Sequence, residues 1–360
     1  MAVETTEFGR DTATPVFSIC VPQYNRTSFF KLAIISYAQQ NFGSVEVCVS
    51  DGGSTDGRHG EVIGALRGIG LPFVFYRSEQ NLRYDSNLRK AITLARGRYC
   101  VLMGNDDALN GAHALDDLWK DIQAHSYPGV ILNDSCDHTT GRRAMRIRRT
   151  GDRGGGPVVA AMHYRNFSFV SGVVLDRSMA QSFSTLEWDG AEMYQTYLGC
   201  RIIASSRNLL ERGVAFTRKD LVVTGETVDG IARAKRIWPC PIIERRTTLT
   251  DFGRLVSAAI APYSGKALRS LNERIMLQHL GITMGYWLFT YRKLQSWRYA
   301  LGIALGLRPT RSAEGVELGL WRRLRVWTVY ICSCIGGLTI PPSVFHTLEH
   351  KLYKFAKSIR

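Results

Sequence analysis

Short apolar runs alternate with segments of helical spacing over the first hundred residues of the chain. Runs at residues 16–22, 45–51, 73–77 and 99–103 predict buried strands, and residues 25–40, 58–67 and 84–95 between them predict helices. The first of these helices is expected to bury one face, formed by Phe29, Leu32, Ala33, Ser36 and Tyr37. Thr27 or Ser28 is its expected N-cap. This βαβαβαβ order predicts a doubly wound α/β domain with a parallel sheet.

The pattern loosens after residue 110 and becomes mainly helical after Pro239 and Pro241. Residues 112–124 and 191–203 have helical spacing, while residues 129–134, 143–149 and 167–176 read as strands. Residues 247–261 and 266–305 then predict long helices. We therefore expect four parts: a flexible N-terminus at 1–14, an α/β domain at 15–238, a helical region at 239–318 and a basic segment at 319–360.

Polar clusters follow each of the four predicted parallel strands. They read PQYNR, DGGSTDG, SEQN and GNDD, and begin at residues 22, 51, 78 and 104. Any one of them could be an ordinary turn. Ligands of such sheets bind at the carboxyl ends of the strands, however, so four clusters on one rim favour a binding site.

Two adjacent carboxylates, Asp106 and Asp107, end the fourth strand, and Asp51 holds the parallel position on the second. Carboxylate oxygens suit Mg²⁺ or Mn²⁺, which usually completes its coordination with water and substrate phosphates. The GGST stretch after Asp51 would let the chain pass close to a nucleotide. The chain has neither the GxxxxGK[ST] phosphate loop nor a GxGxxG turn after the first strand.

The net charge and the spacing of the cysteines indicate the class of partner and the cellular compartment. Lys and Arg outnumber Asp and Glu by 46 to 31, a net charge of +15, which favours a polyanionic partner such as nucleic acid, anionic lipid or a phosphorylated substrate. The eight cysteines are scattered without a CxxC pair, so neither a zinc site nor a disulfide framework is indicated. The first residues carry acids and no apolar stretch, unlike a secretory signal. We expect a reducing, cytosolic environment.

Two stretches carry a resemblance to a known family. FSICVPQYNRTSFFKLAIISYAQQNFGSVEVCVSDGGSTDG and NLRYDSNLRKAITLARGRYCVLMGNDDAL together resemble the N-terminal half of family 2 glycosyltransferases of the GT-A fold. The chain is similar in particular to bacterial enzymes, abequosyltransferase-like proteins among them, that add sugars to lipid-linked O-antigen or capsule units. The match covers roughly residues 15–110. It implies a GT-A-like doubly wound mixed sheet, with a Rossmann-like nucleotide-binding half, for the 15–238 domain.

The resemblance also implies roles for matched positions. Binding of a nucleotide-sugar would fall to Pro22, Tyr24 and Arg26 at the pocket edge, Asp51 at the base, and Asp85 and Asn87 near the ribose or diphosphate. Asp107, with Asp106, would hold Mg²⁺ or Mn²⁺ on the diphosphate. The family's general base lies at the start of a helix after a strand of the FVSGVVL type. Glu192 fits that position best and Asp189 second, although Glu192 could instead be a favourable first-turn acid.

The C-terminal segment mixes apolar and basic residues. Residues 326–345 carry no charge, but Gly336, Gly337, Pro341 and Pro342 are expected to break them, which predicts a shallow or re-entrant membrane insertion. Flanking cations are Arg322, Arg323, Arg325, Lys351, Lys354, Lys357 and Arg360. They suit an anionic membrane surface, and so a peripheral or monotopic protein on the cytoplasmic face of the inner (plasma) membrane. The alternative is a core helix packed on the catalytic domain.

Together these features predict an inverting, metal-dependent glycosyltransferase. Its donor would be a nucleotide-sugar and its acceptor a lipid-linked, polyprenyl diphosphate-bound glycan of bacterial surface polysaccharide. A nucleotidyltransferase that makes nucleotide-sugars remains an alternative, although it would need a basic, Gly-rich triphosphate loop near the N-terminus. A non-catalytic basic protein that binds membrane or nucleic acid is a further one. No known nucleic-acid motif occurs, so no nucleic-acid partner is expected.

Overall fold

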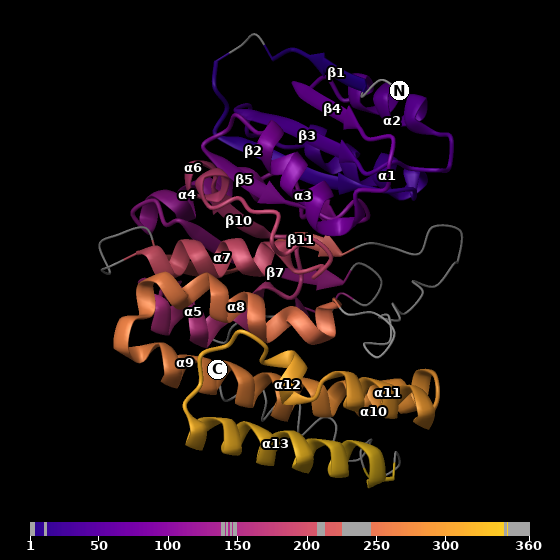
Figure 1. The fold of residues 1–360 in the computed structure, drawn as a ribbon. Coiled ribbons are helices and arrows are strands. Elements are labelled where there is room, and N and C mark those ends of the chain that lie inside the picture. The colour runs from indigo at the N-terminus through magenta and orange to yellow at the C-terminus, as the bar shows by residue number, and fades with distance from the viewer. Residues whose placement is uncertain are drawn as a thin grey trace.

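One mixed sheet organises the molecule (Figure 1). The computed structural model describes residues 4–10, 13–137, 141, 143–144, 146, 150–206, 213–224, 246–341 and 344. Within them the sheet has the spatial order β1 (Glu4–Phe8), β4 (Phe73–Arg77), β3 (Val45–Asp51), β2 (Phe17–Gln23), β5 (Tyr99–Leu102), β10 (Val173–Asp176), β7 (Val130–Asp137), β11 (Val214–Thr224) and β6 (Ala108–Leu109). The short strands β8 (Arg143–Ala144) and β9 (Gly151–Asp152) pair with β7 and β11.

The first half of the sheet has the predicted parallel order. β4, β3, β2 and β5 run parallel, joined by α1 (Thr27–Ala38), α2 (His59–Gly68) and α3 (Arg83–Leu94). Crossover helices of this kind place the carboxyl ends of all four strands on one edge. The N-cap of α1 is Arg26, not Thr27 or Ser28, and no side chain caps the helix.

The N-terminus departs from the expectation of a flexible 1–14 segment. Glu4–Phe8 form β1, which pairs antiparallel with β4 and closes that edge of the sheet. Phe8 stacks on Phe73 with a ring-centroid distance of 5.9 Å. An aromatic cross-strand pair supports a strand even where flanking residues are polar.

The second half of the sheet is mixed. β10 lies antiparallel between β5 and β7, and β11 runs parallel to β7. The helices here are α4 (Ala114–Ala124), α5 (Pro157–His163), α6 (Arg177–Ser182) and α7 (Tyr194–Ser205). The strand expected over 167–176 is only Val173–Asp176, because residues 168–172 form bends and a turn in which Gly172 has a left-handed φ of 82°. The doubly wound mixed α/β sheet is confirmed.

Alternation along the central strands divides the core in two. Ile19, Val47 and Val101 point to one face and pack with α1, α2 and α4. Cys20, Cys48 and Cys100 point to the other face and join a cluster that continues through α3 and α7 into the C-terminal helices as far as Tyr330. Strands buried on both faces read as continuous apolar runs, which is the pattern that predicted them.

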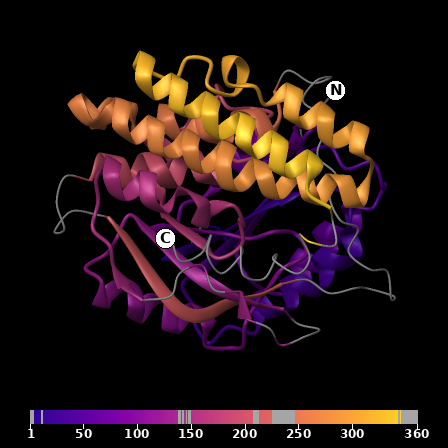
Figure 2. The ribbon, with the colours of Figure 1, turned by 90° about the horizontal axis from the view of Figure 1, so that it is seen from below.

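The C-terminal helices form a further layer, which packs against α5 and α7 on the side away from the sheet (Figures 1 and 2). It contains α8 (Thr248–Ser264), a 3₁₀ turn (Gly265–Ala267), α9 (Leu268–Leu277), a π-helical segment (Gln278–Thr283), α10 (Met284–Leu294), α11 (Trp297–Gly306), α12 (Pro309–Ser312) and α13 (Leu320–Thr339). The predicted helical character of 247–305 is confirmed, with an interruption at Gln295 and Ser296. The predicted boundary at 238/239 lies outside the described residues.

Helix α13 runs unbroken through Gly336 and Gly337, where the sequence predicted a break. A side chain at Gly337 would start 2.6 Å from Leu288 Cδ1 of α10, so the glycine permits close packing of two helices. Val326 and Tyr330 on the same side are buried. In this respect α13 follows the alternative interpretation, a helix packed on the rest of the protein. Among the described residues, no helix is both long enough and apolar enough to span a bilayer.

Candidate active site

The carboxyl ends of β3, β2 and β5 bring the predicted site residues together. β2 lies between β3 and β5, so Asp51 at the end of β3 and Asn105–Asp107 after β5 flank Gln23 at the end of β2. Asn105 Nδ2 donates to Gln23 Oε1 at 3.0 Å, and Gly52 N donates to Gln23 O at 2.9 Å. The rim expected from four separate polar clusters is therefore connected at its centre.

Asp51 is a buried carboxylate with one oxygen engaged and the other unused. Oδ1 accepts from Ser54 N at 2.8 Å and from Ser54 Oγ at 2.6 Å. Oδ2 is buried without a hydrogen-bond partner among the described residues, and Arg77 Nε lies 3.9 Å away. Burial raises the pKa of Asp51, although Ser54 and Arg77 act to lower it. A buried acceptor left open in this way suits a ligand that brings its own N–H.

The loop after β2 carries Tyr24 and Arg26, while Pro22 lies within the strand itself. Tyr24 is exposed. Asn25 and Arg26 both have left-handed backbone, with φ of 51° and 55°. Asn25 Oδ1 accepts from the backbone N–H of Thr55 at 2.8 Å, and Asn25 N donates to Ser54 Oγ at 2.7 Å. These bonds connect the loops after β2 and β3, and they place Asn25 next to Ser54, the residue that donates to Asp51.

Asp106 and Asp107 face the same space beside Gly104. A side chain at Gly104 would start 2.9 Å from Asp107 Oδ2 and 3.2 Å from Asp106 Oδ1, so only glycine leaves that space open. Asp107 is buried and accepts from Ser171 Oγ, whose own oxygen accepts from Gly104 N at 2.7 Å. Asp106 Oδ2 lies 2.9 Å from Arg26 Nη1. Burial, with the charges of Asp107 and Asp106 next, raises the pKa of neighbouring Tyr37.

These two carboxylates fit a Mg²⁺ or Mn²⁺ ion that takes its remaining ligands from a bound substrate. The described residues contain no group of three or more His, Cys, Asp or Glu side chains that could hold a metal. Mg²⁺ is often bound by one or two carboxylates together with substrate phosphates. The donor set therefore fits an ion that arrives with a diphosphate, and does not fit an all-protein metal cage.

Asp85 and Asn87 lie in the first turns of α3 and contact two different parts of the protein. Asn87 Nδ2 donates to Gln23 O at 2.8 Å, and its Oδ1 is buried without a partner among the described residues. Asp85, which is 1% exposed, accepts from the backbone N–H groups of Gly190 at 2.9 Å, Glu192 at 2.7 Å and Tyr194 at 3.0 Å. Burial raises the pKa of Asp85 to about 6, against these three hydrogen bonds. Asn87 thus contacts the strand ends, while Asp85 contacts a distant loop.

That loop, residues 183–193 between α6 and α7, holds both candidate bases. Glu192 is half-buried, two residues before α7, with a left-handed φ of 56°. Asp189 forms a bidentate ion pair with Arg89 and accepts from Ser86 Oγ at 2.7 Å. Although burial acts to raise it, these partners hold the pKa of Asp189 below its ordinary value. Asp189 is thus engaged by Arg89 and Ser86 and is a poor candidate for a residue that takes up a proton.

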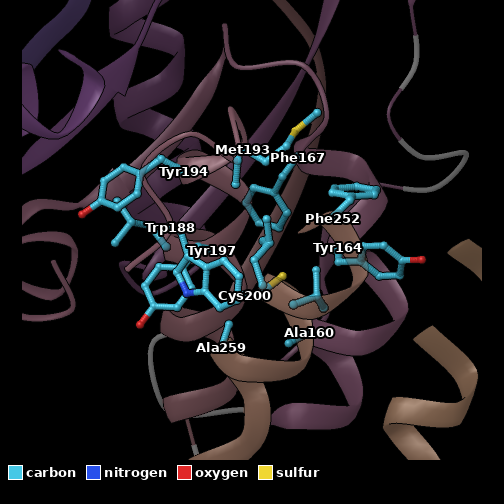
Figure 3. Close-up of a cluster of buried hydrophobic side chains, with 14 of the residues drawn as sticks. Ala160, Tyr164, Phe167, Trp188, Met193, Tyr194, Tyr197, Cys200, Phe252 and Ala259 are labelled. Atoms are coloured by element: carbon cyan, nitrogen blue, oxygen red, sulfur yellow. The ribbon is translucent and has the colours of Figure 1, made fainter. Parts of the chain in front are cut away.

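Buried side chains of the same loop, most of them aromatic, pack into the hydrophobic core (Figure 3). Trp188, Met193 and Tyr194 are buried, and Figure 3 shows them in one cluster with Phe167 and Tyr197. Tyr194 stacks on Tyr197 with a centroid distance of 6.4 Å. The loop is therefore held by apolar packing as well as by α3.

Sequence reasoning missed several residues that organise the site. Ser171 contacts Asp107, Arg77 approaches Asp51, and Arg89 binds Asp189. The one available signal was Ser171, a hydroxyl next to glycine within an otherwise apolar run. Arg77 and Arg89 resemble any surface cation in sequence, since their partners are distant along the chain or lie on another strand.

Comparison with known proteins places this site in a class. Residues 18–169 match the family model described as glycosyl transferase family 2. They contain the rim and its three aspartates, so the part of the chain that carries this site matches the family 2 glycosyltransferases. The resemblance noted from the sequence is thereby confirmed.

Two curated relatives and one solved structure refine the comparison. The chain is 35% identical over 126 residues to abequosyltransferase RfbV of Salmonella typhimurium. The matched region covers 34% of this chain and 38% of the relative. It is 28% identical over 131 residues to a PGL/p-HBAD biosynthesis glycosyltransferase of Mycobacterium bovis, covering 36% and 51%. The chain thus spans about half or less of the length of these relatives.

The solved structure is similar over almost the whole chain. It is S. aureus TarS 1–349 in complex with UDP-GlcNAc, with a TM-score of 0.59 and 16% identity over 93% of this chain and 92% of that one. At this identity the likeness concerns the fold alone. It extends past the family match into the C-terminal helices, and it confirms the GT-A-like architecture.

Proposed function

We propose that this protein is an inverting glycosyltransferase that moves a sugar from a nucleoside diphosphate sugar to a lipid-linked glycan of a bacterial surface polysaccharide. The observation that carries the proposal is the convergence of Asp51, Asp106 and Asp107 at neighbouring strand ends around Gln23. The names of the relatives support it, since one is an abequosyltransferase and another a biosynthetic glycosyltransferase.

The donor would bind across this rim. The open Oδ2 of Asp51 suits a base N–H, and the ribose and diphosphate would then extend past Gln23 toward Arg26. The exposed Arg26 guanidinium suits phosphate oxygens, which Arg binds with paired N–H donors. The TarS complex with UDP-GlcNAc shows that a related fold accepts such a donor.

The transfer itself needs one proton acceptor. An acceptor hydroxyl attacks the anomeric carbon from the face opposite the diphosphate, the bond to the diphosphate oxygen breaks, and the hydroxyl proton passes to the Glu192 carboxylate. General-base help of this kind typically contributes about 10²- to 10⁴-fold in rate. Asp107 and Asp106 would hold Mg²⁺ or Mn²⁺ with the donor, and such an ion neutralises negative charge that develops on a leaving diphosphate.

The acceptor side is proposed to meet a membrane through α13. Leu320, Leu324, Ile331 and Ile335 are all exposed and recur on one face of this helix, and Trp321 beside them is 78% exposed. Figure 1 shows α13 as the outermost helix, on the side away from β1. An apolar stripe on a protein of net charge +15 suits an anionic lipid surface at the cytoplasmic face of the plasma membrane. A polyprenyl diphosphate-linked acceptor would be presented at such a surface.

Two of the arginines expected at the lipid surface have other partners. Arg322 Nε lies 3.1 Å and Arg325 Nη1 2.8 Å from the Glu273 carboxylate of α9. Those contacts tie α13 to the helical layer, so lipid contact would rest on the apolar stripe and on Arg323. The basic tail after residue 344 lies outside the described residues.

A ligand screen tests the proposal directly. Thermal unfolding would be measured with UDP, GDP, CDP and dTDP, each with and without Mn²⁺, because a ligand of the folded state raises the apparent stability. We expect one diphosphate to stabilise the protein most, and more so with Mn²⁺. The matching nucleotide-sugar should then transfer its sugar to a lipid-linked glycan extract. A protein that binds none of them, or that joins a nucleoside triphosphate to a sugar phosphate instead, would refute the proposal.

A further inference from the structure

Asp85 belongs to α3, yet its carboxylate binds the loop that holds Glu192. Three backbone N–H groups, on Gly190, Glu192 and Tyr194, converge on its two oxygens at 2.7–3.0 Å. The partners alternate along the loop, so the loop curls around the carboxylate. A carboxylate that accepts several backbone N–H groups holds a backbone more strongly than neutral bonds do.

The loop conformation that results is one that most residues avoid. Glu192 has φ of 56° and Gly190 has φ of 93°. Left-handed backbone is unfavourable for a residue with a long side chain, by about 1–3 kcal/mol, and persists only where the surroundings impose it. The N–H of Glu192 itself makes the shortest of the three bonds to Asp85. The bond and the strained φ meet at one residue.

A second contact from α3 holds the opposite end of the same curl. Arg89 pairs with Asp189 and also donates to Thr185 O at 3.0 Å, and Ser86 donates to Asp189. Asn87, two residues before Arg89 on α3, donates to Gln23 O at the centre of the nucleotide rim. The same helix therefore contacts both the donor side and the Glu192 side of the proposed site.

From this geometry we infer that Asp85 is a positioning residue, which sets the direction of the Glu192 carboxylate by fixing the backbone on both sides of it. The inference rests on the proposed transfer reaction and on Glu192 as its base. Asp85 makes no contact with the acceptor in this role. It replaces the ribose or diphosphate contact that the family resemblance implied for this position.

The main test is a double-mutant cycle with Asp85→Asn and Glu192→Gln. Asn keeps the volume but sets an N–H donor against a backbone donor, so the loop should shift while the core stays filled. A displacement of about 1 Å in a catalytic group can lower turnover about 10²-fold. We expect Asp85→Asn to lower kcat by that order with donor KM within about threefold, and to add less than about threefold when Glu192→Gln is already present. If Asp85→Asn lowers kcat by the same factor in the wild type and in Glu192→Gln, the inference is overturned.

Hydrogen exchange gives a readout that needs no activity. In Asp85→Asn, a peptide covering residues 185–196 should exchange faster than in the wild type, since three protected amides lose their acceptor. The matched control is Asp176→Asn, another buried aspartate, which caps α6 by accepting from Met179 N at 3.1 Å. It should speed exchange in α6 and leave kcat and the 185–196 peptide unchanged.

The outcomes distinguish the positioning role of Asp85 from the proposed transfer reaction. Faster loop exchange with unchanged kcat would refute positioning while leaving the proposed transfer intact. Unchanged loop exchange in Asp85→Asn would refute the structural basis of the inference. A wild-type protein that transfers no sugar from any nucleotide-sugar would refute the proposed function and the positioning role with it.

Discussion

Arg26 Nη1 lies 2.9 Å from Asp106 Oδ2, so a side-chain cation occupies one of the two carboxylates proposed to bind a metal ion. The pair joins the loops that follow β2 and β5. A metal ion and the guanidinium would compete for this carboxylate until a diphosphate arrives, because phosphate oxygens can take over the guanidinium. Loading of the metal and of the donor should therefore depend on each other.

Replacing Arg26 by Ala tests this competition. We expect Arg26→Ala to tighten Mn²⁺ binding without nucleotide by up to about fivefold, the range for a largely exposed ion pair, and to weaken nucleoside diphosphate binding. Both affinities can be measured by calorimetry. Arg58→Ala, which breaks the exposed pair with Glu61 at 2.8 Å, is the control and should change neither. Unaltered Mn²⁺ and nucleotide affinities in Arg26→Ala would remove the coupling.

Asp107→Asn should lower transfer by on the order of 10²-fold or more while the protein remains folded. The amide keeps the shape that Ser171 contacts but binds a hard cation poorly. Excess chelator should lower wild-type activity in parallel, and added Mn²⁺ should restore the wild type but not the variant. Asp116→Asn, which breaks an ion pair with Lys120 on the solvent side of α4, is the control. Full activity in chelator would exclude the metal role.

Asp51→Asn should separate binding from stability. Loss of a charged acceptor for the base should weaken nucleotide binding about 10- to 100-fold, since hydrogen bonds to charged groups are worth about 1.5–3 kcal/mol. Calorimetric titration of the diphosphate chosen by the thermal screen would measure this. Equal affinity in the variant and the wild type would argue against base contact by Asp51.

The same variant should show a pH-dependent gain in stability. The folded-state pKa of Asp51 is raised by burial, so its favourable contribution is present below the ordinary pKa of 3.8 and is lost as the pH rises through the folded value. Asn does not titrate there. The melting temperature of Asp51→Asn minus that of the wild type should therefore increase with pH across this window and then level off. A difference that does not vary with pH would contradict the raised pKa.

Glu192→Gln should lower kcat far more than it weakens donor binding, because the amide cannot accept the hydroxyl proton. Asp189→Asn should instead lower the melting temperature, since it breaks the pair with Arg89, and should reduce kcat less. Steady-state kinetics and thermal melts of both variants decide between them. A larger loss of kcat in Asp189→Asn would move the base three residues upstream.

Polar substitutions on α13 test the proposed membrane contact without removing the helix. Leu324→Ser, Ile331→Ser and Ile335→Ser together should reduce binding to anionic liposomes at least about tenfold, because each apolar side chain contributes on burial. High salt should release the wild type only partly. Leu32→Ser with Ile35→Ser on α1, at similarly exposed positions, should have no effect. Wild-type protein that ignores anionic liposomes would refute the contact.

The sequence predicted best those strands whose ends follow from the pattern of neighbouring residues alone. β3 and β4 have the expected bounds, 45–51 and 73–77, and β2 and β5 differ from theirs by one residue, because runs buried on both faces end abruptly at polar turns. Asp51 and Asp107 could be placed on one rim for the same reason. The parallel order of the strands then required no knowledge of distant contacts.

Longer-range features could not be read in this way. The run at 167–176 is mostly apolar, and this composition alone does not distinguish the bends and turn at 168–172 from a strand. The glycines of α13 read as breaks, whereas Gly337 allows close contact with Leu288. The bonds from Asp85 to residues 190–194 span more than a hundred positions, and no periodicity connects such sites.

The hydrophobic cluster that runs from Cys20 under the sheet to Tyr330 on α13 has a consequence for protein engineering. The sheet and the C-terminal helices share this side-chain packing, so a chimera cut between them would leave cavities or overlaps at the seam, and truncating one buried leucine alone removes about 2–5 kcal/mol. New specificity for the proposed transfer would be reached more readily by substitutions on the surface than by exchange of whole segments.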